Sequence, residues 1–265
     1  MDAETGTNAA NGSAPAVAER SLPARAVILA GGKGTRLGPY TTVLPKPLLP
    51  IGNKAILDVL VRQLKDAGIT DLTFAVGYLA HLIRAVFGDG SAHGVNIEYH
   101  FEEEPLGTVG PLASLDELDS TFLLMNGDVL TSIDYSDLYR KHREDGNILT
   151  VATHSRIVRS DYGVLHLDGQ NGGTRRVIGY EEKPEIPYTV SMGIYVAEPE
   201  VVDYVPQGQR FDLPDLVLEL LKAEQPVGSY LFDGYWLDIG RHEDYEQAIA
   251  DFESIAPMLL GTAEI

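Results

Sequence analysis

The chain has 265 residues, of which 44% are hydrophobic, and its formal net charge is −19. This length allows one large domain or two small ones with an ample buried core. The negative charge argues against binding to nucleic-acid backbones, and the absence of cysteine excludes disulfides and thiolate metal sites.

The N-terminal segment, residues 1–23, is rich in Ala, Asn, Gly and Ser and has no apolar periodicity, so we expect a flexible tail. It is acidic and small rather than basic and apolar, and no run approaches the roughly 18 apolar residues of a membrane span. The sequence therefore predicts a cytoplasmic protein with no export signal and no membrane partner, and the lack of cysteine is compatible with a reducing compartment.

From residue 24 onward, short apolar runs alternate with helical patterns. The predicted strands cover 24–30, 71–77, 95–101 and 121–128, and the predicted helices cover 55–68, 79–88 and a segment after Thr108. This alternation indicates an α/β fold with a mostly parallel sheet and helices on both faces. The ligand crevice of such a sheet lies at the carboxyl ends of its strands, where both a glycine-rich loop and Asp128 are expected.

The pattern changes near residue 162. Hairpin-like runs at 162–167, 175–184 and 189–197, with a turn at 168–173, predict a small β-rich lobe that faces the substrate. Helical patterns at 213–224 and 243–255 follow. There is no repeat of 20 to 50 residues, which argues against a solenoid.

The glycine-rich loop "GGKGTRL" follows the first predicted strand. Glycines allow several backbone N–H groups to converge on phosphate oxygens. The Walker pattern is absent, and Leu37 stands where a dinucleotide-binding loop needs its third glycine. Arg36 and Lys46 follow instead, with Lys46 held between Pro45 and Pro47. The loop predicts a phosphate site with few, local cations, the alternative being a solvated proline-rich loop.

Six motifs together resemble the sugar-1-phosphate nucleotidyltransferases. They are "LAGGKGTRLGPYTTVLPKP", "EEEPLGTVGPL", "NGDV", "DYGV", "EEKP" and "WLDIG", and they span about residues 24–250. The second motif and the compact length look most similar to guanylyltransferases acting on mannose or heptose 1-phosphate. The resemblance implies a Rossmann-like domain at 24–255 with a nucleotide-binding part at 24–160, a sugar-binding part at 161–240 and a C-terminal extension at 256–265.

The resemblance also implies residue roles. The catalytic residues would be Arg36, Lys46, Asp128, Lys183 and Asp238. The nucleotide would be held by Leu29, Ala30, Gly31, Gly32, Lys33, Gly34, Thr35, Glu102, Gly107 and Thr108. The sugar phosphate would be held by Asp128, Tyr162, Gly163, Glu182, Lys183 and Ser191. A solvated loop cation is an equal alternative for Lys33.

A carboxylate at Asp128, after the apolar run "FLLMN", is costly to bury without a cation beside it. Magnesium suits such a position, because it takes hard oxygen ligands and shares substrate phosphates. By resemblance, Asp238 is the second metal ligand, and Mg²⁺ is the expected cofactor. The alternative for either residue alone is an aspartate that caps a helix or turn.

The implied reaction joins a nucleoside triphosphate and a sugar 1-phosphate and releases pyrophosphate. A phosphate oxygen attacks the α-phosphorus in line, and it is already ionised at neutral pH because the second pKa of a phosphate monoester is near 6. No general base is needed, so we assign the seven histidines to structure or solvent.

Glu102 bears on the base. By resemblance this position lies near the base, and a carboxylate can accept both donors on the edge of guanine, whereas glutamine suits pyrimidines. The alternative is that residues 102–104 form a solvated acidic loop. At Ser191 the family often has asparagine, so the hydrogen bonds offered to the sugar differ here, which leaves an unusual sugar as an alternative.

The expected activity is a guanylyltransferase for mannose 1-phosphate, and the alternative within the family is a thymidylyl-, uridylyl- or cytidylyltransferase for glucose 1-phosphate or another sugar phosphate. A rival function is a non-catalytic member of the same fold that binds nucleotide-sugars and regulates a partner. The intact set of cations and carboxylates favours catalysis. A dehydrogenase is a remote third option, because the third glycine of its loop is missing. The sequence leaves a homo-oligomer open and does not name the sugar.

Overall fold

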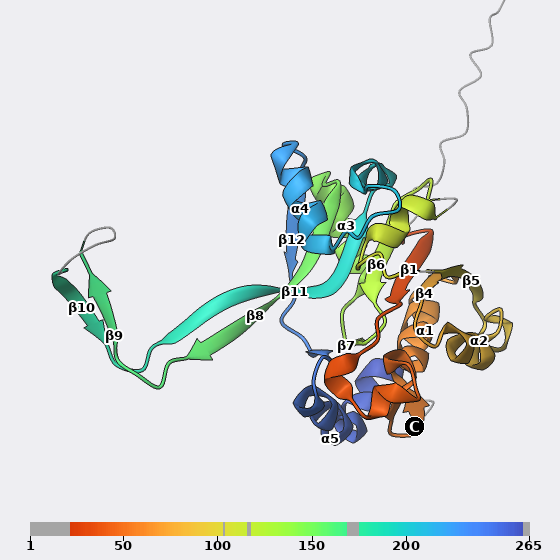
Figure 1. Ribbon diagram of the computed structural model, residues 1–265, viewed down its shortest axis with the longest axis horizontal. Helices are drawn as coiled ribbons and strands as arrows, with labels where there is room; N and C mark the ends of the chain where they lie inside the picture. Colours follow the sequence, from red (N-terminus) through yellow and green to blue (C-terminus); the bar gives the residue numbers. More distant parts are fainter. Residues whose placement is uncertain (1–21, 103, 116–117, 169–174, 262–265) are drawn as a thin grey trace, which may run out of the picture.

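A computed structural model describes residues 22–102, 104–115, 118–168 and 175–261. Its centre is a seven-stranded sheet with strand order β12–β8–β11–β6–β1–β4–β5 (Figure 1). β1, β4, β5 and β6 run parallel, whereas β11 is antiparallel to β6 and β8. The predicted α/β class with a mixed, mostly parallel sheet is confirmed. The strands are β1 (Arg25–Ala30), β4 (Asp71–Val76), β5 (Asn96–Phe101), β6 (Phe122–Asn126), β8 (Leu149–Arg159), β11 (Glu185–Ala197) and β12 (Val227–Leu231).

Helices cover both faces of the sheet because successive strand residues point to opposite sides. In β6, Leu123 and Met125 join one core, while Phe122 and Leu124 join the other. The first core is completed by α1 (Ile56–Ala67), α2 (Ala80–Phe87) and α3 (Tyr135–Asp145). The second is completed by α4 (Leu213–Lys222) and the 3₁₀ helices η5 (Gly110–Ser114) and η6 (Pro199–Tyr204).

A third core lies between α1 and the last helix, α5 (His242–Leu260). It includes Ile56 and Val59 of α1 together with Phe252 and Ile255 of α5, all buried. The remaining elements are short: η1 (Thr35–Leu37), η2 (Tyr40–Thr42), η3 (Lys46–Leu48), η4 (Ser91–His93), β2 (Pro50–Ile51), β3 (Lys54–Ala55), β7 (Val129–Thr131) and β13 (Trp236–Asp238). α5 thus supports the segment that connects β1 to α1.

The outer halves of β8 and β11 leave the body of the molecule and carry a small hairpin of β9 (Val164–Leu167) and β10 (Val177–Glu181) at their end (Figure 1). We call the described residues of 154–190 the arm. The predicted hairpin is therefore present. Its position differs from the prediction, since Figure 1 shows the arm extending into solvent rather than lying over the carboxyl edge of the sheet.

Two helices differ from the sequence prediction. The segment after Thr108 forms only the five-residue η5, because the backbone N–H groups of Val109 and Gly110 donate to the carbonyl of Phe211 instead of continuing a helix. The last helix continues past residue 255 and through Pro257, since burial of Leu259 and Leu260 in the third core offsets the lost backbone hydrogen bond.

Some predictions fall on residues outside the described ranges. These include most of the predicted tail, residues 1–21, most of the turn at 168–173, and residues 262–265 of the C-terminal extension. Among the described residues, no helix has the length and apolar character needed to cross a bilayer.

Candidate functional site

The glycine loop follows β1 at the carboxyl edge of the sheet. Gly31 faces the carboxylate of Glu102 so closely that a Cβ on this glycine would overlap it. Gly34 has a left-handed backbone (φ 59°), and a Cβ there would lie 3.2 Å from the Cβ of Lys46. Side chains are therefore excluded at two points of the loop, which leaves its backbone close to both Glu102 and Lys46.

Asp128 lies between β6 and β7 and forms an ion pair with Lys46 through its Oδ2 atom. Lys46 begins η3 between two buried prolines, Pro45 and Pro47, so its backbone is held firmly. The second oxygen of Asp128, Oδ1, is buried and has no hydrogen-bond partner among the described residues. A buried carboxylate oxygen of this kind normally has a donor or a cation.

Asp238 lies beside Asp128 because β13 pairs antiparallel with β7. The backbone N–H of Ile239 donates to the carbonyl of Asp128 over 3.2 Å, which ties the two segments together. Burial raises the pKa of Asp238, and the negative charge of Asp128 raises it further. Asp128 is partly buried and Asp238 is exposed beside it. Two neighbouring carboxylates that repel each other favour a shared cation.

Arg36 also lies near the two aspartates. Its Nη2 atom lies 3.6 Å from the position of a Cβ on Gly240, next to Asp238, and its positive charge opposes the rise in the pKa of Asp238. The loop after Arg36 is fixed on α5, since the ring Nε2 of His242 donates to the carbonyl of Gly38 over 2.8 Å. The structure therefore brings Arg36, Lys46 and two aspartates together.

Beside these groups lies a pocket of about 340 Å³. Seven residues that the sequence assigned to the site line it, namely Leu29, Gly31, Gly32, Glu102, Gly107, Thr108 and Asp128. Glu102 is half-buried, and burial raises its pKa, while the backbone N–H of Leu106 donates to its Oε2 over 3.1 Å. Its other oxygen faces Gly31.

Four residues of the pocket were missed by the sequence interpretation: Pro105, Asn126, Arg210 and Asp212. Asp212 accepts a hydrogen bond of 2.9 Å from the backbone N–H of Thr108 and also caps α4. The pattern "DLPD" signals a helix start, but it does not tell which loop packs there. Asn126 precedes "GD" in a quoted motif, whereas nothing in the sequence distinguishes Arg210.

The other predicted residues lie elsewhere. Lys33 and Thr35 are exposed beside the pocket but do not line it, and Ala30 is buried in the first core. Ser191 lies in β11, where its hydroxyl and that of Tyr195 share a hydrogen bond of 2.7 Å. The four remaining residues predicted to hold the sugar phosphate are all on the arm: Tyr162, Gly163, Glu182 and Lys183. The structure does not bring them to the pocket of the same chain (Figure 1).

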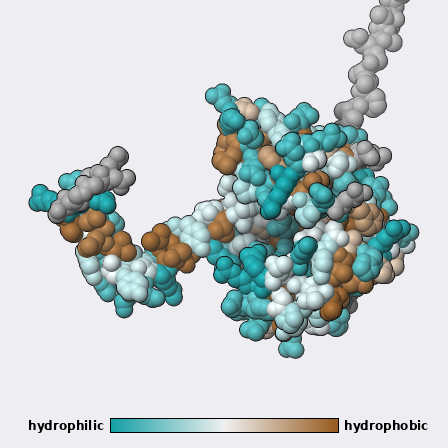
Figure 2. All heavy atoms as spheres, in the orientation of Figure 1, coloured by the Kyte–Doolittle hydropathy of each residue, from teal (hydrophilic) through white to brown (hydrophobic). Residues whose placement is uncertain are grey.

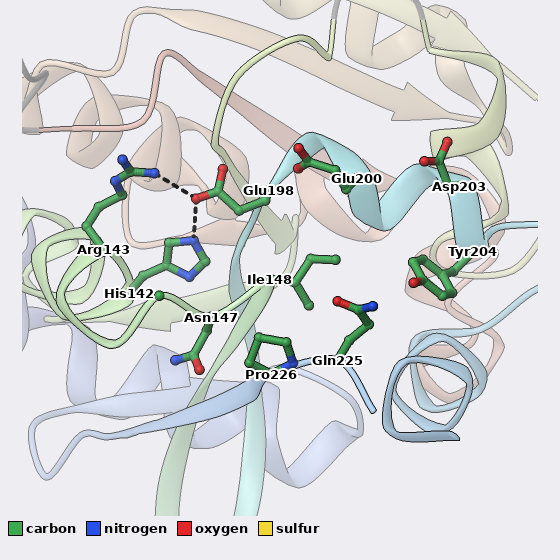
Figure 3. A pocket seen from close by; sticks show the side chains of 11 residues that line it. His142, Arg143, Asn147, Ile148, Glu198, Glu200, Asp203, Tyr204, Gln225 and Pro226 are labelled. Carbon is green, nitrogen blue, oxygen red and sulfur yellow. Dashed lines mark hydrogen bonds and ion pairs between the residues drawn. The ribbon is translucent and has the colours of Figure 1, made fainter. Parts of the chain in front are cut away.

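A second cavity, of about 530 Å³, lies where the end of α3 and the start of β8 meet η6 (Figure 3). Its wall includes His142, which is fully buried and bonds to Thr150 on one side and to Glu198 on the other. Glu198 also accepts from Arg143 and Thr121, so its carboxylate is already satisfied. This cavity has no glycine loop, and its polar network serves the fold.

His142 leads to a prediction about stability. Burial lowers its pKa, so below about pH 6.5 the unfolded chain takes up a proton that the folded chain does not. We expect the free energy of unfolding to fall as the pH drops through this window. Urea titrations at several pH values should show a steeper fall for the natural chain than for His142→Gln, whose amide does not titrate. Equal pH dependence in both proteins would contradict this role.

Fold and site together define a class of protein: an α/β protein with a glycine loop and an acidic pair at the carboxyl edge of its sheet, an arrangement suited to a phosphorylated ligand. The model of the Nucleotidyl transferase family matches residues 25–255, so the chain belongs to this family. This match confirms the resemblance seen in the sequence, and it places the chain in a family of nucleotidyltransferase enzymes.

Two relatives show the range within the family. The chain is 37% identical over 245 residues to a UTP–glucose-1-phosphate uridylyltransferase of Synechocystis sp., covering 85% of this chain and 62% of the relative. It is 36% identical over 243 residues to a mannose-1-phosphate guanylyltransferase of Mycobacterium tuberculosis, covering 88% and 66%. The chain thus spans less than two thirds of the length of these relatives.

Solved structures share the fold. A putative glucose-1-phosphate thymidylyltransferase from Bacillus anthracis, in complex with a sucrose, superimposes with a TM-score of 0.69 at 25% identity and covers 91% of this chain and 96% of its own. HddC from Yersinia pseudotuberculosis, complexed with GMP-PN, gives a TM-score of 0.65 at 26% identity and covers 86% and 99%.

Proposed function

We propose that the protein transfers a nucleotide from a nucleoside triphosphate to a sugar 1-phosphate and releases pyrophosphate. The observation that supports this proposal best is the ion pair between Lys46 and Asp128 next to the glycine loop. Asp238 and Arg36 lie beside this ion pair. Two anionic substrates repel each other, so the reaction depends on cations fixed where charge accumulates.

The chemistry needs no side chain that acts as a general base, because the attacking phosphate oxygen is already ionised. In keeping with this, no histidine is found among the described residues that line the pocket. Arg36 and Lys46 bind and orient the triphosphate, and the backbone of the glycine loop donates hydrogen bonds to phosphate oxygens. Asp128 holds the ammonium of Lys46 in place.

Asp128 and Asp238 fit a magnesium ion. Oδ1 of Asp128 is buried without a partner among the described residues, and Asp238 lies close enough for the charge of Asp128 to raise its pKa. Within the described ranges no group of three or more acidic or imidazole side chains is arranged to hold a metal ion, so phosphates and water would supply the other ligands. When bound, the ion neutralises charge on the leaving pyrophosphate.

We propose GTP and mannose 1-phosphate as the preferred pair. Glu102 supports GTP, because it lines the pocket half-buried rather than standing free in solvent, and a carboxylate can accept both donors of guanine. The relative from M. tuberculosis supports mannose. The second candidate is UTP with glucose 1-phosphate, which the relative from Synechocystis favours.

Exchanging Glu102 for glutamine tests the base preference. We expect Glu102→Gln to lower kcat/KM for GTP by about 10- to 100-fold and to change that for UTP less, since one charge-assisted hydrogen bond to guanine is weakened. The amide oxygen can still accept from Leu106 N–H, so the loop keeps its contact. The matched control is Glu104→Gln, an exposed neighbour.

The assay is a matrix of four nucleoside triphosphates against several sugar phosphates. The GTP proposal fails if UTP or thymidine triphosphate is used at least tenfold better than GTP. It also fails if the ratio of GTP to UTP turnover is the same in Glu102→Gln and in the natural chain.

A further inference from the structure

We propose that two copies of this chain exchange their arms. The arm tip of each copy, meaning the hairpin of β9 and β10 with the residues that flank it, then completes the sugar-phosphate side of the other copy's pocket. This inference rests on the proposed function. It starts from the arm, which reaches away from the body in Figure 1 and from its own pocket.

The arm continues two strands of the central sheet. β8 and β11 stay paired without interruption from Thr153–Ser191 to Arg159–Glu185, which extends the ladder by about 20 Å. Its base is fastened to the body: His154 donates to the carbonyl of Phe232 over 2.7 Å, and the guanidinium of Arg156 lies 4.9 Å from the ring centre of Trp236. To fold back onto its own pocket, the arm would have to break this pairing.

The arm exposes apolar side chains along one face. Val158, Ile186 and Tyr188 share a face by register and are 48%, 50% and 44% exposed. At the hairpin, Leu165 pairs with Tyr180, and both are exposed as well. Figure 2 shows these hydrophobic patches on the arm. A two-stranded hairpin is marginal in water by itself, so such a face calls for a covering surface.

The arm tip has a built arrangement of polar groups. The ring of Tyr180 lies against Gly163, where a Cβ would overlap its hydroxyl, and that hydroxyl donates to Glu182. Lys183 has a left-handed backbone (φ 47°), which is rare for a residue other than glycine and costs free energy. A strained lysine next to an oriented carboxylate is an arrangement that suits a ligand. Figure 1 shows these groups away from the body of the same chain.

The pocket, in turn, lacks a cation for a second phosphate. Among the described residues that line it, Arg210 is the one Lys or Arg, and it pairs with Asp212. Lys46 beside the pocket is paired with Asp128. At about 340 Å³ the pocket is near the lower limit for one ligand, whereas the reaction brings two together. An additional wall with a positive charge would complete it, and Lys183 supplies that charge.

A second copy is the occupant that the charges favour. Residues 154–190 contain five Lys or Arg and five Asp or Glu, so the net charge of −19 belongs entirely to the rest of the chain. Two bodies repel each other, and the neutral arm is the part that meets the least repulsion. A two-fold exchange covers both arms and completes both pockets at once.

Complementation between two inactive variants tests the exchange. Lys183→Asn removes the charge while tolerating the left-handed backbone, and Asp128→Asn disables the pocket. The two chains are co-expressed with different tags and purified as a mixed pair. Exchange predicts that each variant alone is nearly inactive, whereas the mixed pair has about half the natural activity, because one of its two sites is intact. An inactive mixed pair would show that each arm serves its own chain, and would overturn the proposal.

Mass measurement keeps the test independent of the reaction. Light scattering should give a dimer for the natural chain and a monomer for a variant in which residues 157–187 are replaced by Asn-Gly, with circular dichroism as the check that the body is folded. A monomeric natural chain, or a shortened chain that is still a dimer, would overturn the exchange. If the natural chain were a dimer but inactive with every substrate pair, the proposed function would be wrong, whereas the exchange of arms would still stand.

Discussion

Replacing Asp128 with asparagine is expected to lower kcat by about 1,000-fold or more while the fold stays intact. The change removes the charge that holds the ammonium of Lys46 and takes away one of the two carboxylates suited to a magnesium ion. Asparagine has nearly the same shape, so the packing between β6 and β7 should be unaffected. Pyrophosphate release under saturating substrates measures the effect, and thermal unfolding reports on the fold.

Asp66→Asn is the matched control for this change. Asp66 is exposed on α1, outside the pocket, and the substitution removes the same charge from the molecule. Activity of Asp128→Asn within tenfold of the control would remove Asp128 from the site.

The second large effect is expected for Lys46→Gln, which should lower kcat/KM by about 100- to 10,000-fold. The side chain of Lys46 is only 11% exposed and lies between Asp128 and the glycine loop, where the triphosphate is proposed to bind. Its loss removes a fixed positive charge and leaves the partly buried carboxylate of Asp128 with a weaker, neutral donor. We therefore expect a loss of thermal stability as well as of activity.

Lys222→Gln serves as control for Lys46, since this lysine is exposed on α4 and its neighbour Glu219 is exposed too. Steady-state kinetics should give this variant the same kcat/KM as the natural chain. If Lys46→Gln kept the natural kcat/KM for both substrates, the cation at the reacting centre would have to be another residue.

Periodicity was enough to predict the fold. The apolar run of β1, the amphipathic helix α1 and its end at Gly68 all follow local rules, and the structure has them in place. Prediction was weaker where a tertiary contact replaces a local one, as in η5, whose first N–H groups bond to Phe211. The buried leucines beyond Pro257 are a second case, because burial there outweighs the local signal of proline.

The site shows a similar division. Motifs drew attention to Asp128 and Asp238, but their proximity depends on the pairing of β13 with β7, which no local pattern specifies. Asp212 lies in the pocket because its carboxylate accepts a hydrogen bond from the backbone of Thr108, which is again a tertiary contact. The arm makes the same point more strongly, since a hairpin pattern predicts the pairing of β9 with β10 but not the surface against which the hairpin packs.

The most direct test of the proposed reaction is pyrophosphate release by the purified protein with GTP and mannose 1-phosphate, measured with Mg²⁺ and with a chelator in its place. We expect one pyrophosphate for each nucleotide-sugar formed when Mg²⁺ is present, and none with the chelator. If no pyrophosphate appeared with any of the four common triphosphates and a panel of sugar phosphates, the protein would be a nucleotide-sugar-binding regulator rather than an enzyme.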